Sequence, residues 1–131
     1  MINTKELTIG CYVKVNGKPY KVDEIYNGAY GLEESDILFV SIELKPIPIT
    51  KKLLLKNGFE FVKYRNLEQY SKGFGEFNLR FDYKMSNTPN RDWHLQIVIE
   101  ESCSIGGCDV QYIHQVQTLC NILGIDLKLE L

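Results

Sequence analysis

The sequence has little of what marks several large classes of protein. No apolar run approaches the roughly 18 residues that a membrane-spanning helix needs, so we expect no membrane partner. The net charge of the 131 residues is −2, and without a basic excess the chain lacks the field that generic nucleic-acid binding requires. The first residues show no charged stretch followed by an apolar one, so no secretory signal is expected. We therefore expect a cytoplasmic protein.

Residues suited to metal binding are also few: four cysteines and two histidines. Four residues separate Cys103 from Cys108, at the edge of the usual zinc spacing. His114 and Cys120 follow, but on one helix they would point in different directions. We interpret Gly106-Gly107 as a turn between free thiols, and we expect neither a metal nor a cofactor.

Nothing in the sequence forms a recognisable catalytic set. Nucleophilic catalysis needs a nucleophile, a base, an orienting group and an oxyanion site together. Either histidine could meet a cysteine in space, but no pattern marks a thiol of lowered pKa. The sequence therefore favours a protein that is not an enzyme.

The pattern of residues 1–49 is typical of short β-strands joined by tight turns. Asn16-Gly17 and Asn27-Gly28 are two-residue hairpin signals, because both positions accept a positive φ angle. Five such strands predict a small SH3-like β-barrel. Four of them are expected over residues 12–15, 18–25, 29–32 and 37–42.

Residues 50–131 predict an α+β subdomain, so the whole chain is expected to be an α+β protein. A short helix, 51–57, should begin after Thr50 and end at Gly58. Residues 77–85 and 93–100 alternate between apolar and polar, which predicts an antiparallel hairpin with one buried and one solvated face. A further strand is expected over 59–64, while residues 65–75 give no clear prediction.

The C-terminal part predicts an amphipathic helix over residues 109–123, with Asp109 as its N-cap. Apolar side chains fall on one side of this helix and polar ones on the other. The polar side comprises His114, Gln115, Gln117, Thr118 and Asn121. Residues 125–131 alternate, and we expect them to form a closing strand.

Five segments of the sequence also match a set of motifs seen elsewhere: Glu6-Leu7-x-Ile9-Gly10-x-Tyr12-Val13, Tyr20-Lys21-Val22-Asp23, Leu44-Lys45-Pro46-Ile47-Pro48-Ile49-Thr50, Leu54-Leu55-Lys56-x-Gly58-Phe59 and Tyr112-Ile113-His114-Gln115-Val116-Gln117-x-Leu119. Together they resemble a family of short proteins of phages and mobile elements in anaerobic gut bacteria. The likeness spans nearly the whole chain. It implies a phage-associated, cytoplasmic, non-enzymatic accessory protein. One departure is Lys51-Lys52, which stands where family members often carry Glu-Glu.

Three sets of polar side chains are candidates for binding a small anionic ligand such as a nucleotide. The first begins the short helix, the second lies on the solvated face of the hairpin, and the third lies on the polar side of the C-terminal helix. In that order they are Thr50, Lys51 and Lys52; Arg80, Lys84, His94 and Gln96; and His114 and Gln117. Helix N–H groups and ammonium groups attract anions, and donors on strands suit a nucleotide or an acidic partner. Each set is also compatible with ordinary solvated surface.

The resemblance, together with the lack of a catalytic set and the candidate donors above, implies a phage-encoded, non-enzymatic binding protein that counters a host defence, by sequestering a nucleotide immune signal. One alternative is an SH3-like module that blocks a host or phage protein. Another is a small enzyme acting on a nucleotide or a thiol. A homodimer is the expected assembly, since symmetric pairs dominate among small soluble proteins.

Overall fold

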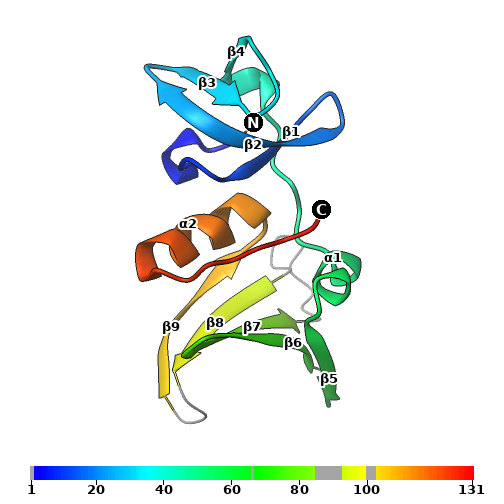
Figure 1. The fold of residues 1–131 in the computed structure, drawn as a ribbon. Helices are drawn as coiled ribbons and strands as arrows, with labels where there is room; N and C mark the ends of the chain where they lie inside the picture. The colour runs from blue at the N-terminus through cyan, green and yellow to red at the C-terminus, as the bar shows by residue number, and fades with distance from the viewer. Residues whose placement is uncertain (1, 66, 85–92, 100–102) are drawn as a thin grey trace. The chain divides into compact units, whose positions relative to one another are not determined.

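The computed structural model describes residues 2–65, 67–84, 93–99 and 103–131, and the fold is mixed α+β, as predicted (Figure 1). The chain divides into two compact units. Unit 1 comprises Met1–Pro48 and Tyr112–Leu123, and unit 2 comprises Ile49–Gln111 and Gly124–Leu131. The C-terminal helix therefore belongs with the N-terminal strands, whereas the sequence divided the chain into residues 1–49 and 50–131.

Unit 1 contains a four-stranded antiparallel half-barrel whose strands neighbour one another in chain order. Two 3-10 helices flank the strands, and the C-terminal α-helix completes the unit. The elements are η1 (Thr4–Glu6), β1 (Tyr12–Val15), β2 (Lys18–Tyr26), β3 (Ala29–Leu32), β4 (Leu38–Val40), η2 (Ser41–Glu43) and α2 (Ile113–Leu123). Its apolar core is built from Ile2, Leu7, Cys11, Val13, Val15, Val22, Tyr30, Leu32 and Leu44.

Both asparagine–glycine turns are hairpin turns, as the sequence predicts. Asn16 and Gly17 join β1 to β2 with φ angles of 51° and 79°, and Gly28 has a φ angle of 75° between β2 and β3. The expected strand over residues 37–42 is shorter than predicted. The N–H of Val40 donates to the Glu43 carboxylate at 3.0 Å, and the chain turns into η2 at that point. The half-barrel accordingly has four strands where five were expected.

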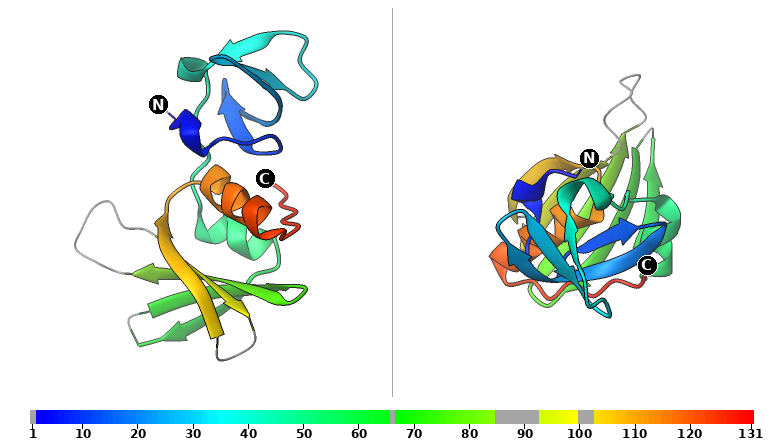
Figure 2. Two further views of the ribbon diagram at one scale, coloured as in Figure 1. Left: turned by 90° about the vertical axis from the view of Figure 1, so that its left-hand side faces the viewer. Right: turned by 90° about the horizontal axis from the view of Figure 1, so that it is seen from above.

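Unit 2 is a five-stranded antiparallel sheet with a short helix and an extended C-terminal segment (Figure 2). The strands again follow chain order: β5 (Glu60–Tyr64), β6 (Leu67–Phe74), β7 (Phe77–Lys84), β8 (Trp93–Ile99) and β9 (Cys103–Val110), with α1 at Lys51–Lys56. Aromatic rings gather on the inner face of the sheet, where Trp93 makes edge contacts with Tyr70 and Phe81. Trp93 is 4% exposed, and its indole N–H donates to the Ile49 carbonyl at 3.0 Å.

The hairpin predicted from alternation is confirmed as the β7–β8 pair, with Phe81 opposite Leu95. Residues 65–75, which gave no prediction, contain β6. The sequence of β6 shows no alternation of apolar and polar residues, because the charged Glu68 and Lys72 share the inner face with Tyr70. Each is satisfied there, Glu68 by Lys51 and Lys72 by the Asn57 carbonyl at 2.7 Å. The expected strand ends at Met85 and Glu100 and the loop 86–92 lie outside the described residues.

Three expectations for the C-terminal part were wrong. Gly106-Gly107 is not a turn, because Cys103–Val110 pairs with β8 as strand β9, and the helix consequently begins at Ile113 rather than after Asp109. Residues 125–131 form no strand; hydrogen bonds hold them in unit 2. The Glu130 N–H donates to Asn57 Oδ1 at 2.7 Å, and Asn57 Nδ2 donates to the Glu130 carbonyl at 2.9 Å.

The polar side of α2 was a candidate binding set that is also compatible with solvated surface, but its central residues are buried in unit 1. His114 is 1% exposed and Gln117 is 6% exposed. This side of the helix lies against residues 6–12 of the same unit, and we call the contact the polar seam. On the helix it comprises His114, Gln115, Gln117, Thr118 and Asn121.

Gln117 makes the most complete contact of the polar seam. Its Oε1 accepts from the Tyr12 N–H at 2.8 Å, and its Nε2 donates to the Gly10 carbonyl at 3.2 Å. A buried side-chain amide with both ends paired replaces backbone partners that the start of β1 lacks. The seam therefore joins α2 to the half-barrel by hydrogen bonds that a plain amphipathic pattern does not reveal.

Replacing Gln117 with alanine should lower the free energy of unfolding by about 1–3 kcal/mol, because the partly buried Tyr12 N–H and Gly10 carbonyl then lose their partners. Urea unfolding followed by circular dichroism measures the change. The matched control is Asn121→Ala, which removes an exposed seam bond to Thr8 and should change stability by less than about 0.5 kcal/mol. Equal losses in the two variants would contradict the role given to Gln117.

Candidate functional site

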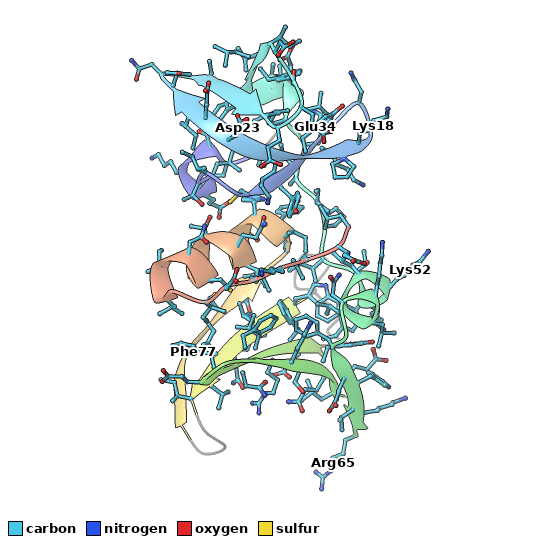
Figure 3. The ribbon with its side chains drawn as sticks, in the orientation of Figure 1. Lys18, Asp23, Glu34, Lys52, Arg65 and Phe77 are labelled. Carbon is cyan, nitrogen blue, oxygen red and sulfur yellow. The ribbon has the colours of Figure 1, made fainter. Side chains whose placement is uncertain are left out.

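The first candidate set, at the start of α1, is largely engaged in holding the helix. Thr50 Oγ1 accepts from the Leu53 N–H at 3.1 Å, so Thr50 is the N-cap that the sequence predicts. Lys51 pairs with Glu68, and its Nζ also lies 4.4 Å from the centre of the Tyr83 ring. The hydrogen bond to Glu68 raises the pKa of Lys51. Lys52 alone of the three extends away from the helix, as Figure 3 shows.

The second set lies on the outer face of the five-stranded sheet. The strand register places two rows of residues across β6 to β9. One row holds Gln69, Asp82, His94 and Asp109, and the other holds Ser71, Arg80, Gln96 and Gly107. The structure thus brings Arg80, His94 and Gln96 together, as the hairpin pattern predicted. The side chain of Lys84 lies outside the described part of the chain.

These side chains pair with one another, except that the buried Arg80 Nε makes no hydrogen bond. Arg80 Nη2 contacts Gln96 Oε1, and Arg80 Nε lies 3.9 Å from Asp82 Oδ1. The same Asp82 oxygen accepts from Gln69 Nε2 at 3.3 Å, and Asp82 is only 6% exposed. His94 Nδ1 lies 3.0 Å from Asp109 Oδ1. The guanidinium charge is therefore matched by a neighbouring carboxylate.

A shallow hollow of about 410 Å³ lies beside Arg80, over β6 and β7. Its lining includes Gln69, Ser71, Asn78 and the acidic Glu76. Such a surface offers several neutral donors and acceptors but no surplus of positive charge. It can hydrogen-bond a neutral polar group more readily than it can hold a phosphate.

The third set belongs to the polar seam of unit 1. His114 Nε2 lies 3.2 Å from Glu6 Oε1, and the ring stacks on Tyr112 with a centroid separation of 5.8 Å. Burial lowers the pKa of His114, although the neighbouring Glu6 acts in the opposite sense. Gln117 holds the start of β1, as described above. Both residues therefore serve the packing of α2, and a role for them in ligand binding stays a prediction.

Two of the described thiols, Cys108 and Cys120, are poorly suited to nucleophilic chemistry. Cys11, Cys108 and Cys120 are free. Burial raises the pKa of Cys120 to about 12, and burial together with Asp109 raises the pKa of Cys108. A raised thiol pKa means little thiolate at neutral pH. Within the described residues, no three metal-ligating side chains gather at one point.

The sequence did not single out an apolar surface on unit 1. Five large apolar side chains at or beside β4 are each at least half exposed: Tyr26 (57%), Ile37 (64%), Leu38 (53%), Val40 (50%) and Ile42 (65%). We call this the β4 patch. The register puts Tyr26 and Val40 on either side of Ala29, on one face of the sheet, while Phe39 and Tyr30 face the core.

A possible sequence signal for the patch is the nearly unbroken apolar run 37–42. A strand with one solvated face alternates, so an apolar run indicates that both faces are covered. In this half-barrel β4 is an edge strand with one covered face. The second face of β4, which is also apolar, is left exposed.

Acidic residues are concentrated in the segment of chain that carries the β4 patch. From Val22 to Leu44 the sequence has six Asp or Glu residues and no Lys or Arg. Glu24 shares a row with Gly31 and Leu38, and the Asp23 carboxylate also lies close to Gly31, since a Cβ added there would be 2.9 Å from Asp23 Oδ1. Glu43 lies beside Val40. Figure 3 labels Asp23 and Glu34 among these residues.

Comparison with protein-family models, curated proteins and solved structures finds no match to this chain. Among the helices of the described residues, none has the length and apolar character needed to cross a membrane.

The place of His94 on the sheet depends on Gly107. A Cβ at Gly107 would lie 2.8 Å from His94 Nε2 and 3.2 Å from the Leu95 carbonyl oxygen. We expect Gly107→Ala to displace His94 from Asp109 and to cost about 1–3 kcal/mol of stability through overpacking. Nuclear magnetic resonance of the His94 ring and chemical unfolding measure both effects.

Gly73→Ala is the matched control for this substitution, since Gly73 lies in β6 of the same sheet with no atom within 4 Å of an added Cβ. We expect that variant to be at least as stable as the parent. The double variant His94→Ala/Gly107→Ala should recover part of the loss. If Gly107→Ala leaves the His94 resonances unchanged, the packing argument is wrong.

His114 should make unit 1 less stable in mild acid. Its pKa in the folded chain lies below the ordinary value of 6.5, so as the pH falls through 6.5 the unfolded chain takes up a proton before the folded chain does. Stability should therefore fall between about pH 7 and pH 5.5, and it should fall less in His114→Gln. Urea unfolding at several pH values compares the two slopes. Parallel slopes would show that His114 does not control this dependence.

Proposed function

We propose that this chain is a non-enzymatic binding protein that acts by holding another protein, and that the β4 patch is its contact surface. The observation that carries the proposal is the concentration of exposed apolar side chains at and beside the edge strand β4, from Tyr26 to Ile42. Contiguous apolar surface of this kind typically marks a site of interaction, whereas isolated exposed apolar residues are common and carry no such meaning.

The proposal is supported by how the other candidate surfaces are occupied. Lys51 is paired with Glu68, Arg80 has Asp82 and Gln96 beside it, and His114 is buried. Sequestration of a nucleotide signal remains a second proposal, supported by the Arg80 hollow with its amide and hydroxyl groups. The protein-binding proposal ranks first because that hollow is also lined by Glu76, whose carboxylate repels phosphate.

A role in countering a host defence belongs to the same proposal. Its support is the resemblance to phage and mobile-element proteins, and an apolar patch suits a protein that covers a surface of its target. Assembly as a homodimer likewise remains a proposal, through a surface yet to be assigned.

A photo-crosslinking amino acid placed at Leu38 tests this function in cells that encode the chain. We expect one stoichiometric adduct through position 38, and none through position 122, since Ile122 is 75% exposed on α2 and lies outside the patch. The partner identified by mass spectrometry is then purified, and its affinity measured by calorimetry. Leu38→Ser should weaken binding at least about tenfold, because a buried apolar anchor is worth about 1.4 kcal/mol or more.

Ile122→Ser is the control for that affinity and should bind like the parent protein. Equal crosslinking at the two positions, or unchanged affinity in Leu38→Ser, would contradict the assigned surface. A nucleotide-sized added mass in native mass spectrometry of the freshly purified protein, with no protein adduct, would favour the sequestration proposal.

A further inference from the structure

We infer that the partner of the β4 patch is a basic amphipathic helix, in which an apolar stripe is flanked by lysine or arginine side chains. This inference rests on the proposed function and adds the chemistry of the partner. The β4 patch supplies the apolar centre of the contact, and its surroundings supply the charge.

The residues around the patch indicate which sign of charge its partner must carry. Six carboxylates and no cation occur from Val22 to Leu44, although the whole chain has fifteen Lys and Arg residues against seventeen Asp and Glu. The described side chains Asp23, Glu24, Glu33, Glu34, Asp36 and Glu43 are all exposed. A partner that covers the apolar centre therefore meets a rim of negative charge. Complementary charge at the rim of an interface speeds association and excludes partners of the wrong sign.

The same rim disfavours other occupants of the patch. A second copy of the chain, docked about a two-fold axis on this surface, would bring two acidic rims together. Nucleic acids and anionic lipid surfaces carry the same sign as the rim and would be repelled. A basic protein segment is the occupant whose charge matches.

An added β-strand is also disfavoured, although β4 is an edge strand. β4 has only three residues, and its Val40 N–H already donates to the Glu43 carboxylate at 3.0 Å. Short edge strands with engaged N–H groups resist pairing with another strand. Side-chain contact with a helix needs no free backbone group, since the helix satisfies its own. This favours a helix over an extended peptide.

Synthetic peptides test the inference with the whole chain. The first probe is a 14-residue amphipathic helix in which leucine forms the stripe and lysine fills the other positions; the second replaces every lysine with glutamate. Fluorescence anisotropy measures both affinities at about 20 mM and about 150 mM salt. We expect the lysine probe to bind at least about tenfold more tightly than the glutamate probe, with a smaller difference at the higher salt concentration.

Three variants assign that binding to the surface. Leu38→Ser should lower the affinity for the lysine probe at least about tenfold. Glu33→Lys/Glu34→Lys should lower that affinity by a similar factor and remove most of its dependence on salt. Glu60→Lys, a charge change at an exposed position of unit 2, is the control and should leave the affinity unchanged. Thermal unfolding of each variant verifies that it folds.

The outcomes separate the two proposals. Equal affinity for both probes, lost in Leu38→Ser, would overturn the basic partner while keeping the patch as a binding surface. Binding of neither probe would overturn the inferred helix. If Leu38→Ser binds the lysine probe as tightly as the parent protein does, the binding site is not the β4 patch and the inference is overturned. A dimer in sedimentation that Leu38→Ser dissociates would show that the occupant is a second copy, and would overturn the inference.

Discussion

The polar seam between α2 and residues 6–12 is the contact on which unit 1 depends. Hydrogen bonds from one helix face reach Glu6, Thr8, Gly10 and Tyr12 in turn. These partners lie more than a hundred residues away in sequence, so the seam closes a very long loop of chain. Its interactions are directional, and a shift of α2 by one turn would leave buried polar groups without partners at a cost of about 1–3 kcal/mol each. The seam therefore fixes the register of the helix on the half-barrel.

Polar side chains on the outer face of the five-stranded sheet also have partners within the protein, which makes this face a weak candidate for anion binding. Asp82 is nearly buried, and it is compensated by Gln69 and by the nearby Arg80. An incoming phosphate would have to compete with this carboxylate for the guanidinium group. Removing Arg80 from Asp82 would leave a buried charge uncompensated, which is costly in a protein interior. Arg80 is therefore better placed to maintain the sheet than to hold an exchangeable ligand.

Much of the fold could be predicted from local patterns, and the failures have a common cause. Asn16-Gly17, the Thr50 cap and the β7–β8 hairpin depend on neighbours in the sequence or on strict alternation. β6 and β9 were missed because Glu68 and Lys72 face inward with partners, and because glycines 106 and 107 add nothing to an alternating pattern.

The candidate site was harder to predict for the same reason. His114 and Gln117 are polar, so a single-sequence pattern assigns them to solvent, and only the distant backbone of residues 6–12 shows that they are buried. The β4 patch was missed in the opposite way, because its apolar run is typical of a strand covered on both faces. Which residues are covered depends on the edge of a sheet, and the sequence does not mark that edge.

The acidic rim answers a problem that the β4 patch creates for the free protein. An edge strand with an exposed apolar face is prone to pair with copies of itself. Carboxylates around it, including the one that engages the Val40 N–H, oppose that association by repulsion and by occupying a backbone donor. A rim that only prevented aggregation would serve equally well if it were basic or of mixed sign. A rim of one sign beside an apolar centre also selects among partners, and this double use is the argument for reading the patch as a binding surface.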